Sequence, residues 1–241
     1  MSGYLGYLTF DDILSGILEM EDASFMEKTV GSKRHYKPIS YLAKIEGKEK
    51  ENNLFFSLKN GRIEELEFEI EERLPKIPSE IGNLKKLERL HIFIGSHSNN
   101  IFADEFKAES VKYLAIDCSV KDTTIPDMLY SFPNLRWLRI VGTNSRPVVK
   151  LENSFKKLHN LETLELHNVR LNELPETIVS LKNLFYIDLT CTSIKSVSVP
   201  ILLTLRRTGL RSLKLVGNTD LIISEGEIKA LKKRIRLDLR S

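Results

Sequence analysis

The sequence predicts an α/β solenoid, in which a short strand and a helical or irregular return segment recur along the chain and build one parallel sheet. Residues 161–184 alternate apolar and polar residues first with period two and then place apolar residues three and four apart. The strand part of this stretch recurs at nearly constant spacing, whereas the first 60 residues do not follow it. One such unit cannot bury its own apolar side, so it must stack between copies of itself.

The strand motif carries apolar residues at its positions one, four and six. Its starts lie 24, 24, 24, 26, 23 and 26 residues apart, a regularity that ordinary clustering of apolar residues does not produce. The seven starting residues are Ile63, Leu87, Val111, Leu135, Leu161, Leu184 and Leu210. An eighth strand is expected at residues 235–239, as an edge or cap.

Two return segments have the end signals of helices. Residues 199–205 begin with Pro200 near the first turn, and Gly209 lies past the end. Ser224 and Glu227 have the spacing of a capping box, which predicts a final helix over residues 225–233.

Residues 1–60 are expected to cover the open end of the solenoid core, and residues 61–241 to form seven or eight repeats. Thr9 begins a predicted helix with acidic residues in its first turn. A strand is expected at residues 39–45 and a charged turn at residues 48–53. The Asn60-Gly61 pair then predicts a β-hairpin whose second strand is also the first strand of the repeat. A separate N-terminal domain with its own activity is the alternative, although sixty residues make a thin core.

The composition is that of a water-soluble protein, with 41% hydrophobic and 29% charged residues. The chain has no apolar run of membrane-spanning length, and acidic residues interrupt the N-terminal apolar positions, so neither a membrane span nor a secretory signal is expected. The two cysteines, Cys118 and Cys191, are too few for a disulfide framework, which favours a cytoplasmic location.

Residues 63–239 resemble leucine-rich-repeat proteins of the L-P-x-x-I type. The resemblance is carried by passages such as IPSEIGNLKKLERLHI and ELPETIVSLKNLFYIDL. This form occurs in Ras-suppressor-type proteins, in plant intracellular immune receptors and in small microbial repeat proteins. The resemblance implies a horseshoe whose concave sheet binds another macromolecule, usually a protein. The family's ninth-position Asn is matched only by Asn218, while Val169 and Thr192 replace it elsewhere, and this difference implies irregular curvature.

The sequence contains no phosphate-binding, dinucleotide-binding, nucleophile-elbow or zinc-ligand motif. His91 and His97 are six residues apart and fit solvated surface histidines better than a metal pair. Cys118 and Cys191 fall at position eight of units three repeats apart, too distant for a disulfide, and are expected to be small buried residues at the strand ends. We therefore expect no catalytic residues, no cofactor and no metal.

The polar positions of stacked repeats form lanes across the sheet, in which aromatic and arginine side chains are unexpectedly frequent. Trp137, the only tryptophan, is expected to face solvent inside the arc. Aromatic residues together with arginine are typical of the energetic centres of protein interfaces. The alternatives are that these side chains pack on one another or on an insertion, or that the register is wrong. The candidate partner-binding residues are Arg89, Phe93, Tyr113, Arg136, Trp137, Arg139, Phe185 and Tyr186.

The expected function is that of a non-catalytic recognition scaffold, binding a protein or peptide on its concave sheet. The first half of the chain is acidic and the second half basic. A nucleic-acid-associated solenoid that uses the basic C-terminal end is therefore the alternative, although that end lacks interleaved aromatic residues. The opposite end charges also permit weak self-association through edge strands.

Overall fold

The structure, a computed structural model, describes residues 37–45, 48–59, 62–70, 77, 81–82, 84–95, 106–121, 123–125, 129–151, 154–171 and 173–240. Side chains are described from residue 64 onward, except that of residue 154. The following account of the molecule refers to these residues.

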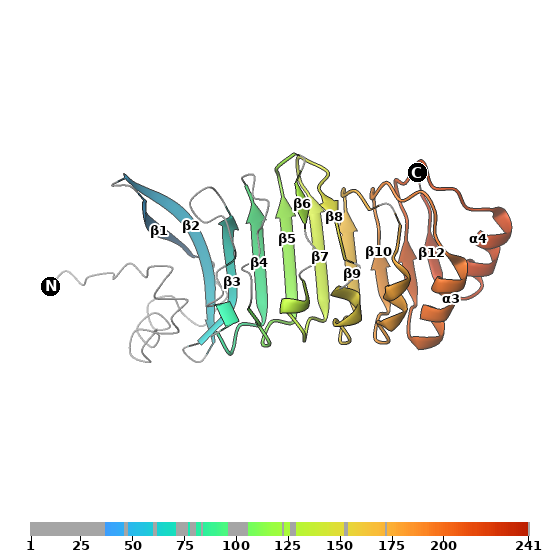
Figure 1. Cartoon of the computed structure of the whole chain (residues 1–241), viewed down its shortest axis with the longest axis horizontal. Coiled ribbons are helices and arrows are strands. Elements are labelled where there is room, and N and C mark those ends of the chain that lie inside the picture. Colours follow the sequence, from blue (N-terminus) through green and yellow to red (C-terminus); the bar gives the residue numbers. More distant parts are fainter. Residues whose placement is uncertain are drawn as a thin grey trace.

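The described strands form one long sheet and one short pair (Figure 1). In spatial order the long sheet contains β1 (Lys37–Ile45), β2 (Lys48–Lys59), β3 (Arg62–Ile70), β4 (Arg89–Ile94), β5 (Tyr113–Cys118), β7 (Trp137–Gly142), β9 (Thr163–His167), β10 (Tyr186–Asp188), β11 (Ser212–Lys214) and β12 (Arg236–Asp238). The short pair is β6 (Thr124–Ile125) with β8 (Val148–Val149). From β3 to β12 every neighbouring pair in the long sheet is parallel, which confirms the predicted solenoid.

Helical segments connect the later strands and form the second layer of the solenoid. They are the 3₁₀ helices η2 (Leu129–Ser131), η3 (Ser154–Lys156) and η4 (Glu176–Ser180), and the α-helices α3 (Val199–Thr208) and α4 (Glu225–Lys232). The predicted helix at Pro200 is confirmed and runs three residues further than expected, ending against Gly209. Ser224 and Glu227 form both hydrogen bonds of the predicted capping box at the start of α4.

The core lies between the sheet and the return segments. Strand residues alternate between buried and half-buried, so that in β7 Leu138 and Ile140 are fully buried while Trp137 and Arg139 are not. Leucines and isoleucines at motif positions one, four and six stack from β3 to β11 in one continuous cluster. The leucine spacing therefore fixes the register, because a shift by one residue would expose the whole apolar row.

Polar residues at the strand ends bind the backbone of the preceding unit. Asn218 donates to the Leu189 carbonyl at 2.7 Å and accepts from the Thr192 amide at 2.9 Å. The hydroxyls of Ser119 and Thr143, also at position nine, donate at 3.2 Å to carbonyls one unit earlier. Serine and threonine hydroxyls thus make inter-unit hydrogen bonds in units that lack the ninth-position Asn.

Asn168, one residue before the expected position, also replaces the missing Asn. It adopts a positive φ of 51° and donates to the carbonyls of Gly142 and Ser145 at 2.7 and 3.2 Å. A side chain at Gly142 would lie only 2.3 Å from the Asn168 carbonyl oxygen, so this close approach requires glycine.

The N-terminal strands agree only in part with the sequence-based expectation. The hairpin is confirmed, since β2 pairs antiparallel with β3, and β3 in turn pairs parallel with β4. The turn expected at residues 48–53 is wrong: these residues begin β2 and pair antiparallel with β1. Regular pairing with β1 extends the strand through this charged segment, which local polarity alone did not indicate. The helix expected after Thr9 lies outside the described residues, and the division at residue 60 stays a prediction.

Candidate functional site

The half-buried residues of the parallel strands form an open sheet face, represented in β4 by Arg89, His91 and Phe93. The strand register aligns these residues into lanes that run across the sheet. The position-three lane contains Glu65, Arg89, Tyr113, Trp137, Thr163, Tyr186 and Ser212. The position-five lane contains Glu67, His91, Ala115, Arg139, Glu165, Asp188 and Lys214.

A hollow of about 220 Å³ lies on this face above Ala115. The methyl group of Ala115 is the smallest side chain in its lane and stands between His91 and Arg139 of the neighbouring strands. Larger side chains on all sides therefore become walls around it. The complete lining is Glu65, Leu66, Glu67, Arg89, Leu90, His91, Tyr113, Ala115, Trp137 and Arg139.

One wall of the hollow is a row of stacked planar groups. The Tyr113 and Trp137 rings lie with their centroids 6.4 Å apart at 55°, within the range of favourable aromatic pairs. The Arg89 guanidinium lies 5.0 Å from the Tyr113 ring centroid, a cation–π distance. Arg89 also donates to Glu65 at 2.8 Å. This row fixes the two aromatic rings in the wall of the hollow.

Arg139 forms another part of the wall, and carboxylates on the neighbouring strands attract its guanidinium. Its guanidinium nitrogens lie 3.8 Å from Asp117 and 3.9 Å from Glu165, the carboxylates of the two neighbouring strands. No hydrogen bond to its guanidinium is found among the described residues. His91, opposite Arg139 across Ala115, lies 2.8 Å from Asp117 and 3.4 Å from Glu67 through its two ring nitrogens. Arg89 and Arg139 thus each lie beside at least one carboxylate, whereas Glu67, among the residues that the structure describes, has only the His91 ring beside it.

The structure brings four of the eight sequence-predicted site residues together around the hollow: Arg89, Tyr113, Trp137 and Arg139. Phe93 lies beside them, with its ring centroid 4.2 Å from that of His91. Arg136 is exposed and forms an ion pair with Glu162 just outside the hollow. Phe185 and Tyr186 lie two units away, and Phe185 is 45% exposed.

Tyr186 belongs to a second cluster, centred on Asp188, which the sequence did not predict as special. Asp188 is only 4% exposed although it stands in the position-five lane. Its carboxylate accepts from Tyr186 at 2.9 Å and from the Thr190 hydroxyl at 2.5 Å. Lys214 and His167 approach it at 3.2 and 3.4 Å.

These contacts decide the ionisation of Asp188. Burial alone raises the pKa of the Asp188 carboxyl, but the nearby His167 ring, the hydrogen bonds from Thr190 and Tyr186 and the Lys214 ammonium together lower it well below its ordinary value. For Tyr186, burial is the main cause that raises the pKa of the phenol. Asp188 is therefore ionised at neutral pH and fully engaged within its own sheet. The sequence shows the Asp–x–Thr spacing with Tyr186 two residues before Asp188, but it does not show that the carboxylate is buried.

The two cysteines are free. Cys118 is buried, as expected, and burial raises the pKa of its thiol. Cys191 is half-buried rather than buried, because a positive φ of 56° turns the chain at the strand end. The raised pKa of the Cys118 thiol is the opposite of the lowered pKa that a reactive cysteine has.

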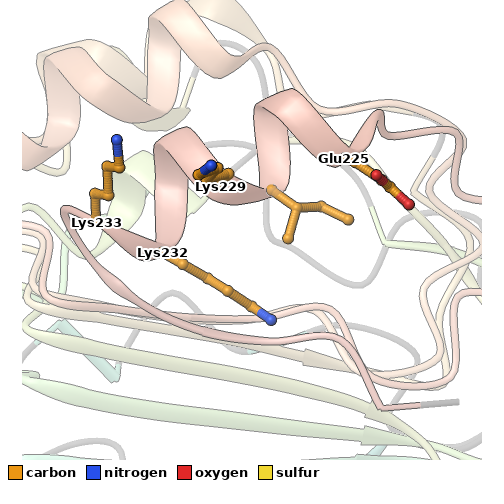
Figure 2. A pocket seen from close by; sticks show the side chains of 5 residues that line it. Glu225, Lys229, Lys232 and Lys233 are labelled. Atoms are coloured by element: carbon orange, nitrogen blue, oxygen red, sulfur yellow. The ribbon is translucent and has the colours of Figure 1, made fainter.

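The basic C-terminal end presents its lysines on α4. Lys229, Lys232 and Lys233 project from this helix together with Glu225 at its start (Figure 2). This surface and the partly buried Ile228 outline a shallow depression whose lining comes from α4 alone. A depression formed by one helix has no opposing wall, so it does not enclose a ligand.

Two further findings concern metal binding and membrane spanning by the described residues. No group of three or more His, Cys, Asp or Glu residues in the described ranges is arranged to hold a metal ion. Among the same residues, no helix combines the length and apolar character needed to cross a membrane.

Comparison with known proteins gives two sequence relatives of the chain. It is 30% identical over 147 residues to the volume-regulated anion channel subunit LRRC8B of Mus musculus, which is 60% of this chain and 18% of that protein. It is also 30% identical over 125 residues to the subunit LRRC8D of Rattus norvegicus, which is 51% of this chain and 14% of that protein. The chain thus spans less than one fifth of the length of either subunit. No family model matches the sequence.

Among solved structures, an LRR protein of Leptospira interrogans matches with a TM-score of 0.45 and 21% identity, over 68% of this chain and 51% of that one. InlP of Listeria monocytogenes matches with a TM-score of 0.35 and 13% identity, over 64% and 49%. The repeat itself is defined by this chain's own leucine spacing and by parallel strands stacked in matching register. These features, together with the two sequence relatives, identify the chain as a leucine-rich-repeat protein.

Proposed function

We propose that this protein is a non-catalytic recognition scaffold that binds a protein or peptide on its open sheet face, with the hollow above Ala115 as the centre of the contact. The observation that carries the proposal is the coincidence of the hollow with Tyr113, Trp137, Arg89 and Arg139. Leucine-rich-repeat domains are generally protein-interaction scaffolds without catalytic activity. The arrangement fits that role, because a few aromatic and arginine side chains at a concave centre carry most of the binding energy in typical interfaces.

The size of the hollow favours a side chain of a partner over a small-molecule ligand. Small-molecule sites usually enclose about 300–1,000 Å³ and bury most of their ligand. The hollow has about 220 Å³ and opens on the sheet face. It therefore has room for one anchoring side chain, while the rest of the partner lies across the neighbouring lanes.

A paired substitution tests this proposal. Trp137→Ala with Tyr113→Ala removes the aromatic wall, and both side chains lie on the sheet face, so the core leucines are untouched. Capture of binding proteins from the native source by the intact chain should fall sharply for this variant. Phe185→Ala is the matched control, since Phe185 is an exposed aromatic residue on the same sheet but outside the hollow. Equal capture by the double variant and the intact chain would contradict the proposal.

The nucleic-acid alternative has weaker support. The lysines of α4 share their helix with Glu225 and Glu227, and Lys214 and Arg240 are already paired with Asp188 and Asp238. Nucleic-acid binding would have to fall steeply as salt rises, by the release of counterions from the phosphates. We further propose a reducing, cytoplasmic location on the basis of the two free cysteines.

A further inference from the structure

We propose that the hollow receives an uncharged aromatic or aliphatic side chain of a peptide segment, and that a lysine or arginine of the same segment binds the carboxylates of β3. This inference rests on the proposed function and specifies the chemistry of its partner. Three features carry it: the charge balance inside the hollow, the acidic edge beside it, and the surroundings of Arg139.

The interior of the hollow favours an uncharged anchor. Apart from Glu67 at the β3 rim, the charged groups in its wall already have a counter-charge: Glu65 is paired with Arg89, and Arg139 stands between Asp117 and Glu165. A charge inserted between them would lose water without gaining a partner of its own, which is costly. The floor offers apolar contact through the Ala115 methyl group, and the Tyr113 and Trp137 rings offer a stacking surface.

The β3 side of the hollow favours a cation. Glu65, Glu67 and Glu69 project in succession on the open face of β3, and the register places Arg89, His91 and Phe93 opposite them. Of these three carboxylates only Glu65 has an arginine opposite it, because Glu67 faces His91 and Glu69 faces Phe93. This excess of negative charge attracts a basic side chain to the rim.

The strand spacing sets the distance between the two partner residues. Glu67 lies two strands from Ala115, which is roughly 10 Å at the usual distance between neighbouring strands. An extended peptide advances about 3.3 Å per residue. A segment that crosses the strands should therefore carry its basic residue about three positions from its anchor.

A peptide with an acidic residue is the alternative. The Arg139 guanidinium makes no hydrogen bond among the described residues, so a partner carboxylate could pair with it. Asp117 and Glu165 nevertheless flank it at 3.8 and 3.9 Å, and Glu67 completes the acidic surroundings on the far side of Ala115. A partner carboxylate would have to approach Arg139 against these charges. The local field therefore disfavours an acidic segment.

The experiment is selection of a random peptide library on the intact chain, with counter-selection on the Ala115→Leu variant. Leucine at this position grows into the hollow from the open face and leaves the core leucines in place. Affinities of the selected peptides are then measured through the emission of Trp137, the single tryptophan of the chain. Each peptide is also measured against Glu67→Gln with Glu69→Gln. The charge-matched control is Glu173→Gln with Glu176→Gln, two exposed carboxylates away from the open sheet face.

We expect the selected peptides to share an aromatic or aliphatic residue and a lysine or arginine about three positions apart. Their binding should be lost on Ala115→Leu and weakened about fivefold by the Glu67/Glu69 double variant, as expected for two exposed ion pairs. The control pair should leave the affinity unchanged.

The remaining outcomes separate the inference from the proposed function. Peptides that depend on Ala115 but lack the basic residue, carry acidic residues instead, or ignore the Glu67/Glu69 variant would overturn the inference and leave the proposed function standing. Failure to select any peptide whose binding depends on Ala115 would overturn both.

Discussion

The open sheet face contains two sites of similar plan, in which a tyrosine is followed two residues later by alanine in one and by aspartate in the other. In the first, Ala115 follows Tyr113 by two residues and faces Arg139 on the next strand. In the second, Asp188 follows Tyr186 by two residues and faces Lys214 on the next strand. The alanine leaves a hollow, with the tyrosine ring and the arginine exposed at its rim. The aspartate fills the equivalent space and engages both neighbours.

This comparison shows why similar residues on one sheet have different roles. A tyrosine next to a cation is available to a partner only when nothing within the protein satisfies the pair. At Asp188 the carboxylate has Tyr186, Thr190 and Lys214 as partners, so the site stabilises the sheet. At Ala115 no carboxylate of the described residues joins Tyr113 to Arg139, so the space between them stays open. We therefore assign stability to the Asp188 site and binding to the Ala115 site, and the following substitutions test that division.

The largest effect is expected from Asp188→Ala. It leaves Tyr186, Thr190 and Lys214 without their common acceptor, and the loss of a buried, hydrogen-bonded charge should lower the free energy of unfolding by about 3 kcal/mol. Urea denaturation followed by circular dichroism measures this change. Glu165→Ala is the control in the same lane, because its contact with Arg139 at 3.9 Å lies at the surface. An equal loss in both variants would remove the distinction between the two sites.

The pH dependence of stability should also come from the Asp188 site. Hydrogen bonds lower the pKa of Asp188 in the folded protein, so its stabilisation is fully present above the unfolded-state pKa of about 3.9. It is lost as the pH falls through the lower folded-state pKa. The stability difference between the parent and Asp188→Asn should therefore be largest near neutral pH and shrink in acid. A difference that stayed constant down to pH ~2 would refute this assignment.

The binding site should respond to Trp137→Ala in the opposite way. Removing an aromatic anchor at the centre of an interface typically costs about 2 kcal/mol of binding, or roughly 30-fold in affinity. Trp137 lies on the open face, so the free energy of unfolding should change little. Isothermal titration with a selected peptide and urea denaturation measure the two effects separately. If stability fell while affinity held, the hollow would be a structural feature.

The smallest effect is expected from Thr190→Val. This substitution removes one hydroxyl donor to Asp188 at 2.5 Å and keeps the backbone amide donor at 3.2 Å. A single hydrogen bond to a charged group contributes about 1.5–3 kcal/mol, and the amide donor remains, so the loss should be smaller than that of Asp188→Ala. Thermal unfolding of the two variants side by side ranks them. The reverse ranking would mean that Asp188 does not organise the cluster.

The sequence predicts the sheet and its register well, because leucine spacing is a physical constraint. A unit of nearly constant length must place equivalent residues on adjacent strands, so Tyr113 and Trp137 fall into one lane and pair as expected. The open face follows from the same alternation. The positions of Arg89, Tyr113, Trp137 and Arg139 around one point are thus accessible from the sequence alone.

The hollow itself and the Asp188 cluster are not accessible in that way. Alanine is a common residue on a sheet face. Ala115 becomes important only because the side chains around it are larger than its own methyl group. The burial of Asp188 depends on side chains from three strands that close over it, and no single unit shows this. The family pattern was also an incomplete guide. It counts the ninth-position Asn as missing from the Leu161 unit, whereas Asn168, one residue earlier, makes the inter-unit hydrogen bond in its place.

The emission of Trp137 reports directly on whether a peptide binds above Ala115, because the only tryptophan of the chain lies in the wall of the hollow. A peptide bound above Ala115 should shift the emission maximum to the blue and quench or enhance it saturably. The same titration of Ala115→Leu should show no change, while Asp188→Asn should bind like the parent. A saturable response that is identical in the parent and in Ala115→Leu would contradict the account.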